Sequence, residues 1–251
     1  MKLRRLFLCL AAVMGLASSL PAQETAPAST AAPSTASLAP APQAREYLIV
    51  SGGPALRFFE RGKKSSHDIY WGNFIRGAHL RIKQIMAEKA PQDEVTWIVF
   101  RPAYLRRGEE MGEKLLPQII KEANEDGVSL FWFDTTPELI NYVNQGKNRA
   151  VEPIIDFEFF GHSNRNCFLF DYSNDFDAMA MNFFHARAIR YLEPGAFAQG
   201  ATAKSWGCHT GEYFSDVWKR HLGFLMTGAI GKTDYANGSI PVVSRGGKWN
   251  Q

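Results

Sequence analysis

Long apolar segments are missing from most of this sequence. After residue 22, no stretch approaches the roughly 20 apolar residues that a membrane-spanning helix requires. Lysine and arginine are not clustered as they are on a nucleic-acid-binding surface, and neither of the usual zinc patterns, Cys-x-x-Cys and His-Glu-x-x-His, occurs. Gly52-Gly53 lacks the spacing of a dinucleotide or phosphate-binding fingerprint, which leaves a tight turn as its role. We therefore expect no membrane span, no nucleic-acid partner and no metal site.

Residues 1–22 have the pattern of an export signal. Three basic side chains precede an apolar run over residues 6–20, and the small residue Ala22 follows Pro21 as a cleavage position. These three cations equal the formal net charge of +3, so the remaining chain is close to neutral. We expect the signal to be removed and the protein to be exported to the periplasm or the extracellular space.

The rest of the chain divides into a tether and a folded domain. Residues 23–44 are almost entirely Ala, Pro, Ser and Thr, a composition that buries too little apolar surface to offset the entropy of ordering. We expect this segment to be a disordered linker. Residues 45–251 are rich in Phe and Trp and are numerous enough for one α/β domain with a sizeable core.

Strand-like and helix-like patterns alternate along this domain. The predicted strands are 47–50, 95–100, 128–133, a strand running up to His162, a hairpin strand over 167–172, a strand running up to Cys208, and 224–230. The predicted helices, which lie between these strands, are 70–89, 109–125, a short helix from Thr136, 175–191, and a helix from Thr210 to His221. Such alternation predicts an α/β three-layer sandwich, with a mainly parallel sheet covered by helices on both faces.

Two apolar runs in the second half of the chain each end in a reactive side chain, His162 in one and Cys208 in the other. Each run breaks at a glycine-containing turn, so both side chains are expected at the carboxyl edge of the sheet, where α/β proteins carry their chemistry. Cys208 follows His162 by 46 residues, close to the roughly 50 that separate the same residue types in caspases. A thiolate stabilised by a histidine and by a helix that begins at Thr210 is an effective nucleophile.

These motifs resemble those of the caspase-like cysteine peptidases, the group that also contains legumains, gingipains, separases and CHAT domains. The resemblance covers residues 153–234 by motif, and the segment Gly207-Cys208-His209-Thr210-Gly211-Glu212 is similar to the cysteine turn of the CHAT branch. It implies a caspase-like fold in which His162 is the general base and Cys208 the nucleophile. It also implies a peptide or protein substrate and a reaction that needs no cofactor.

The sequence departs from the family pattern at both turns. Ser163 replaces the glycine whose backbone N–H helps to bind the oxyanion in that family. Trp206-Gly207 replaces the family's Gln-Ala or Ser-Ala, which alters the wall of the substrate pocket. Two further residues are candidates for orienting groups. His209 is either a turn residue or an orienting partner, and Asp156 either marks a solvated face of its strand or orients His162.

Two alternatives remain open. A disulfide between Cys208 and Cys167 would leave no thiolate and would make the protein a secreted binding or scaffold domain of the same fold. Alternatively, Gly161-His162-Ser163-Asn164 resembles the nucleophile elbow of serine esterases, although that motif requires a small residue where Arg165 stands. The acid and base of such an esterase would come from Asp171, Asp177, His209 and His221.

Overall fold

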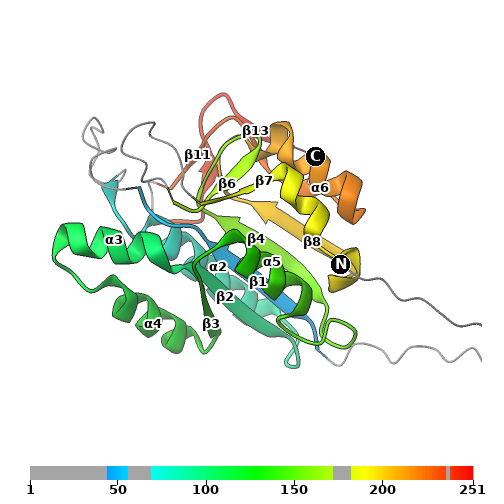
Figure 1. Ribbon diagram of the computed structural model, residues 1–251, viewed down its shortest axis with the longest axis horizontal. Helices are drawn as coiled ribbons and strands as arrows, with labels where there is room; N and C mark the ends of the chain where they lie inside the picture. Colours follow the sequence, from blue (N-terminus) through cyan, green and yellow to red (C-terminus); the bar gives the residue numbers. More distant parts are fainter. Residues whose placement is uncertain (1–43, 56–68, 172–181, 236–237, 251) are drawn as a thin grey trace, which may run out of the picture. The chain divides into compact units, whose positions relative to one another are not determined.

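The structure is a computed structural model of the chain, shown in Figure 1. It describes residues 44–55, 69–171, 182–235 and 238–250. All of these belong to the compact unit Pro40–Gln251. The expected export signal, and the expected linker apart from Ala44, lie outside the described residues.

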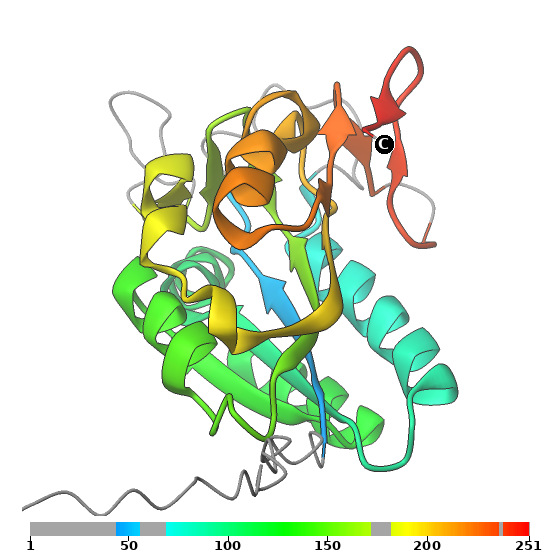
Figure 2. The same ribbon diagram turned by 90° about the vertical axis from the view of Figure 1, so that its right-hand side faces the viewer.

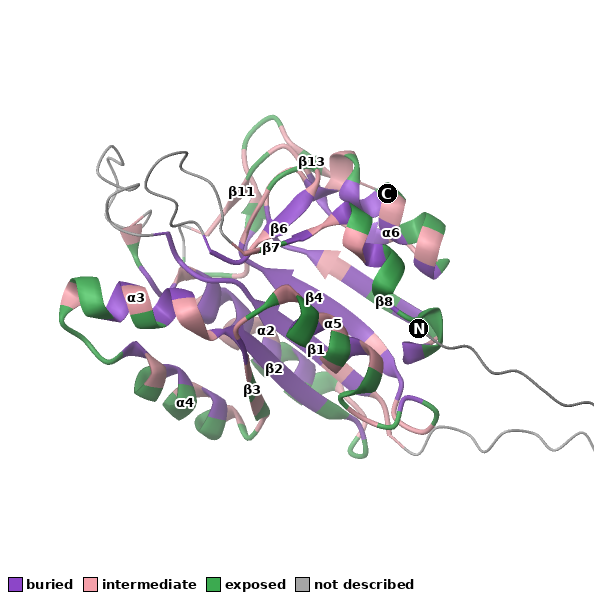
Figure 3. Cartoon of the chain, viewed as in Figure 1, coloured by how far each residue is buried: buried purple, intermediate pink, exposed green. Residues whose placement is uncertain are grey.

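A six-stranded parallel sheet forms the centre of this unit (Figure 1). Its strands lie in the order β3 (Ser129–Phe133), β2 (Glu94–Phe100), β1 (Glu46–Ser51), β4 (Ile154–Phe160), β8 (Phe197–Ser205) and β9 (Met226–Thr227). Every neighbouring pair is parallel. The nearly continuous apolar runs of β1 and β2 fit strands that are buried on both faces, as Figure 3 shows for the centre of the sheet.

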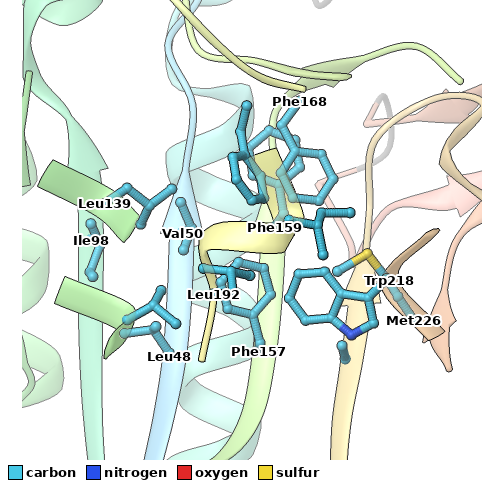
Figure 4. Packing of buried hydrophobic residues seen from close by; sticks show 14 of the residues in the cluster. Leu48, Val50, Ile98, Leu139, Phe157, Phe159, Phe168, Leu192, Trp218 and Met226 are labelled. Carbon is cyan, nitrogen blue, oxygen red and sulfur yellow. The ribbon is translucent and has the colours of Figure 1, made fainter. Parts of the chain in front are cut away.

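Helices cover both faces of the sheet, which confirms the predicted three-layer α/β sandwich (Figure 2). On one face lie α2 (Asn73–Glu88), α4 (Leu115–Asp126) and part of α3 (Arg101–Met111); on the other lie α5 (Thr136–Gln145), the 3-10 helix Ala186–Tyr191 and α6 (Phe214–Leu222). Successive residues of β1 face opposite layers, so Ile49 joins the α2 side while Leu48 and Val50 join the α5 and α6 side. Figure 4 shows this second core, where the rings of Phe157 and Trp218 lie 5.1 Å apart.

Three short antiparallel sheets lie beyond the carboxyl ends of the parallel strands (Figure 2). They consist of β5 (His162–Ser163), β6 (Cys167–Leu169) and β7 (Phe183–His185), of β10 (Ala229–Ile230) with β13 (Lys248–Trp249), and of β11 (Thr233–Asp234) with β12 (Val242–Val243). Within the described part of the chain, no helix has the length and apolar character needed to cross a bilayer.

The predicted helix over 109–125 is wrong in extent, because the chain forms two helices there. The first helix, α3, begins at Arg101 with a proline in its first positions. It ends at Gly112, whose φ of 69° is left-handed and stops the helix. The second helix, α4, then starts at Leu115.

The predictions over 175–191 and 224–230 are also wrong in their described parts. Residues 183–191 form β7 and a 3-10 helix, because strand pairing with β6 buries Phe184 against Phe168 and Phe214. Residues 175–181 lie outside the described ranges. The predicted strand over 224–230 is divided between β9 of the central sheet and β10 of a two-stranded sheet.

Candidate active site

The adjacent strands β4 and β8 carry His162 and Cys208 to neighbouring places at the sheet edge. Phe159 of β4 is in register with Ser205 of β8, and the N–H of Trp206 donates to the carbonyl of Phe159 at 2.8 Å. His162 follows Phe159 by three residues, and Cys208 follows Ser205 by three residues. Because the strands are parallel, both turns leave the sheet side by side.

The two turns are in direct contact through Ser163 and Gly207. The Ser163 hydroxyl donates a hydrogen bond of 2.7 Å to the carbonyl of Cys208. A Cβ atom on Gly207 would lie 2.1 Å from Ser163 Oγ and 3.0 Å from the carbonyl oxygen of Gly161. Only glycine therefore permits this approach, and the predicted turn residues Ser163 and Gly207 join the histidine turn to the cysteine turn.

The contact between the two turns lies next to the place where the strand order of the sheet reverses direction. From β1 the chain proceeds outward through β2 and β3, and then returns to the other side of β1 with β4, β8 and β9. In open parallel sheets, ligands bind outside the carboxyl ends of the strands at such a reversal. The turn after β1 is tied to this place, because Gly52 N–H donates to Phe160 and Gly53 N–H donates to Phe170, at 2.8 and 2.9 Å.

His162 is partly exposed and lies against an aromatic wall. Its ring meets Phe74 edge to face, with the ring centroids 4.8 Å apart, and Phe74 in turn meets Tyr235 at 5.1 Å. Phe74 comes from the first turn of α2. Helix α2 therefore supplies one side of the candidate site.

Asp156 is not brought to His162. The carboxylate accepts a hydrogen bond of 2.6 Å from Thr202 and lies 3.9 Å from the Arg81 guanidinium. Six residues separate it from His162, about 20 Å along a strand. It is buried rather than on a solvated face, and burial, together with the nearby Glu158 charge, raises the pKa of Asp156 to about 8. Its role lies in the covered face of the sheet.

Both described cysteines are free thiols in unlike surroundings. Cys208 is partly exposed, and its Sγ atom is contacted by the backbone N–H of Thr233 at 3.4 Å and by the Thr233 hydroxyl oxygen at 3.5 Å. Cys167 is buried in β6, in register with His185 of β7. Burial raises the pKa of the Cys167 thiol to about 11. Cys208 is therefore the better candidate for a nucleophile.

His209 belongs to a locked turn directly after Cys208. Its φ of 62° is left-handed, a conformation uncommon for residues other than glycine. The His209 N–H donates to Gly231 O at 2.7 Å, and its Nδ1 lies 2.6 Å from Glu212 Oε1. The hydrogen bond to His209 lowers the pKa of Glu212. Thr210 does not cap a helix with its side chain, since its hydroxyl makes no hydrogen bond to any described residue and α6 begins only at Phe214.

Trp206 lies inward from the cysteine turn, on the α2 side of the sheet. Its ring stacks on Phe160 at 5.6 Å and meets Trp249 at 5.5 Å, and Lys204 Nζ lies 3.6 Å from the ring centroid. Its indole N–H donates to Glu158 at 2.5 Å. Trp206, which we expected in the wall of a substrate pocket, is thus 6% exposed and held by its neighbours.

The partners expected for a serine esterase are not gathered around Ser163. Its hydroxyl is engaged with a backbone carbonyl, and the chain continues into the β5–β6 hairpin rather than into the helix of a nucleophile elbow. Asp171 is buried in an ion pair with Arg106, and His221 Nε2 contacts the carbonyl of Leu192 at 2.8 Å. Asp177 lies outside the described residues.

Thr233, Phe74 and Tyr235 are the site residues that sequence reasoning missed. Thr233 belongs to a two-residue strand without an apolar pattern, and nothing in the sequence signals its place beside Cys208. No three His, Cys, Asp or Glu residues within the described ranges are grouped so as to hold a metal ion. Comparison of the chain with protein-family models, curated proteins and solved structures gives no match.

Proposed function

We propose that this protein is an exported, caspase-like cysteine peptidase, with Cys208 as nucleophile and His162 as general base. The observation that carries the proposal is the register of β4 and β8, which brings the two turns into contact at the carboxyl edge of a parallel sheet. The free, partly exposed thiol of Cys208 supports the same assignment.

The reaction follows from these two groups. His162 accepts the thiol proton as the Cys208 sulfur attacks the carbonyl carbon of a peptide bond. The tetrahedral intermediate then collapses, the C–N bond breaks, and the imidazolium of His162 gives its proton to the leaving amine. Water attacks the resulting thioester with His162 again as base, which releases the acid product and restores the thiol.

A backbone donor for the developing oxyanion is present at the nucleophile. Among the described residues, the N–H of Cys208 finds no hydrogen-bond partner. The next amide, that of His209, is occupied by the carbonyl of Gly231. We assign the Cys208 N–H as the oxyanion donor, a type of interaction worth roughly 10²- to 10³-fold in rate.

The test compares three variants on labelled casein and a mixed peptide library. We expect Cys208→Ala to lower kcat/KM by roughly 10³-fold or more and His162→Ala by roughly 10²- to 10⁴-fold. Cys167→Ala removes the other described thiol and serves as the matched control, with activity close to that of the unaltered protein. Cleavage that survives in Cys208→Ala would refute the assignment.

A further inference from the structure

Thr233 contacts the Cys208 sulfur twice, although 25 residues separate them in sequence. Its backbone N–H donates to Sγ at 3.4 Å, and its hydroxyl oxygen lies 3.5 Å from the same atom. Both contacts come from one residue of the β11–β12 hairpin. They join the cysteine turn to a part of the chain that neither β4 nor β8 positions.

The chemistry of these contacts favours the ionised form of the sulfur. A backbone N–H can only donate, so it interacts better with a thiolate than with a thiol. The Thr233 hydroxyl oxygen can accept a hydrogen bond from the neutral thiol, and the hydroxyl can rotate to donate to the sulfur once the thiol proton has left. Hydrogen bonds to a charged acceptor are roughly twice as strong as those between neutral groups.

Residues 231–235, which include Thr233, are hydrogen-bonded to the chain both before and after Cys208. Before it, Gly231 O accepts the N–H of His209, the residue that follows Cys208. After it, the hydroxyl of Tyr235 donates to Trp206 O at 3.1 Å, two residues before Cys208. Residues 231–235 are thus bound to the chain on either side of Cys208, which fixes the direction of the Thr233 N–H.

The outer side of this segment is anchored as well. Thr233 is in register with Val243 of β12, and Ser244 N–H donates to Lys232 O at 2.8 Å. The guanidinium of Arg76 on α2 donates to the carbonyl of Tyr235 at 2.7 Å. A donor held in this way is in place before the thiolate forms, which is the requirement for electrostatic preorganisation.

We propose that Thr233 is a positioning residue that stabilises the Cys208 thiolate and holds the sulfur in place for attack. The inference rests on the proposed function, since it names the residue that prepares that nucleophile. It concerns the ionisation of a sulfur atom, so it can be measured without a substrate.

The experiment follows the pH dependence of iodoacetamide alkylation at Cys208, read by mass spectrometry of the peptide that contains it. Thr233→Val keeps the shape of the side chain and removes the hydroxyl. We expect its alkylation midpoint to rise by roughly one pH unit, with the rate on the acid side about tenfold lower. Thr233→Ser restores the hydroxyl and should alkylate within about twofold of the unaltered protein, by the same scale.

Thr136→Val is the matched control, because it removes a threonine hydroxyl that donates to Phe183 O, on α5 and away from the cysteine turn. Its alkylation profile should coincide with that of the unaltered protein. If the profile of Thr233→Val also coincides, or if Thr233→Ser shifts as far as Thr233→Val, the role proposed for the Thr233 hydroxyl is wrong. The backbone N–H, which both variants keep, is tested by the next measurement.

A second measurement does not depend on the folding of a Thr233 variant. In the unaltered protein, the amide proton resonance of Thr233 should move with pH through the midpoint of Cys208 alkylation, and Cys208→Ala should abolish that movement. An amide resonance that titrates identically in both proteins would overturn the inference. Failure of peptide cleavage alone would count against the peptidase proposal and would leave both of these readouts intact.

Discussion

The strands β4 and β8 concentrate ionisable side chains in two regions that differ in exposure and partners. At their carboxyl ends, His162 and Cys208 are partly exposed. Under α2, the carboxylates of Asp156 and Glu158 are buried beside Arg81. Neighbouring stretches of the same strands therefore hold ionisable groups in different surroundings, and the position along the strand decides whether a group is exposed or covered.

The covered network consists of Asp156, Glu158, Arg81 and Trp206, which are joined by hydrogen bonds and ion pairs under α2. Glu158 is 1% exposed, and it accepts from Arg81 Nε at 2.6 Å and from the indole N–H of Trp206 at 2.5 Å. Burial lowers the pKa of Lys204, which lies over the Trp206 ring. Groups that are buried and paired in this way cannot meet a substrate. An acidic residue on a strand that leads to the site therefore need not take part in the chemistry of the site.

The largest expected effect comes from opening the covered network. Arg81→Leu leaves the Glu158 carboxylate buried without its cation, and breaking a buried pair from one side is strongly destabilising. We expect the free energy of unfolding in urea to fall by about 3 kcal/mol. Lys83→Leu, an exposed change on the same helix, should cost less than about 0.5 kcal/mol. An equal effect of the two variants would show that the pair contributes nothing.

A smaller effect is expected where the two turns meet. Gly207→Ala places a methyl group 2.1 Å from Ser163 Oγ, and overpacking of this kind costs about 1–3 kcal/mol. The added methyl should also push the cysteine turn away from the histidine turn and slow alkylation of Cys208. Gly195→Ala is the matched control, because a Cβ there meets nothing within 4 Å. Urea unfolding and mass-spectrometric alkylation measure both consequences.

The central strands could be predicted from the sequence because strands that are buried on both faces consist of nearly continuous apolar residues. The apolar runs of β1, β2 and β4 are readable as strands, and the break after β4 and after β8 locates the two turns. The parallel order follows from the helices between them. The register that brings the two turns into contact is a property of the folded sheet alone.

The covered network could not be predicted, because alternating polar and apolar residues occur both on strands with an exposed face and on strands whose polar residues are buried in pairs. Asp156 and Glu158 alternate with apolar residues, a pattern that an exposed face also produces. Only the position of Arg81 on α2 shows that this face is buried and neutralised. Thr233 was beyond prediction for a related reason, since its contact with Cys208 joins a two-residue strand to a turn 25 residues away.

The titration of the covered region should appear as a pH dependence of stability. The pKa of Asp156 is raised from 3.8 to about 8, so the folded protein keeps a proton that the unfolded chain releases above pH 4. Stability from this group is complete below its unfolded pKa and is lost as the pH rises through about 8. Asp156→Asn cannot titrate, so the part of the fall in stability between pH 4 and 8 that comes from this group should disappear in that variant.

The control for this measurement is Asp216→Asn, an exposed carboxylate in the first turn of α6. Its stability curve should follow that of the unaltered protein between pH 4 and 8. Urea unfolding at several pH values gives both curves. If Asp156→Asn falls as steeply as the unaltered protein, then the Asp156 carboxyl is already ionised in the folded state at pH 4.

The smallest effect on stability is expected beyond the carboxyl ends of the strands, in the partly exposed pair of His209 and Glu212. Both side chains are about one-third exposed, so Glu212→Gln should cost only about 0.5 kcal/mol at pH 7. Because the folded pKa of Glu212 is lowered, this contribution exists above the unfolded pKa and disappears as the pH falls through the folded value.

The same variant distinguishes the two histidines of the site. If His162 is the base, Glu212→Gln should leave the rate of peptide cleavage within about threefold, because the pair only locks the turn and an exposed pair is worth little. Glu125→Gln, in an exposed pair with Lys121, is the control. A loss in Glu212→Gln as large as that in His162→Ala would instead assign the general base to His209, whose Nδ1 the carboxylate holds as the acid of a catalytic triad does.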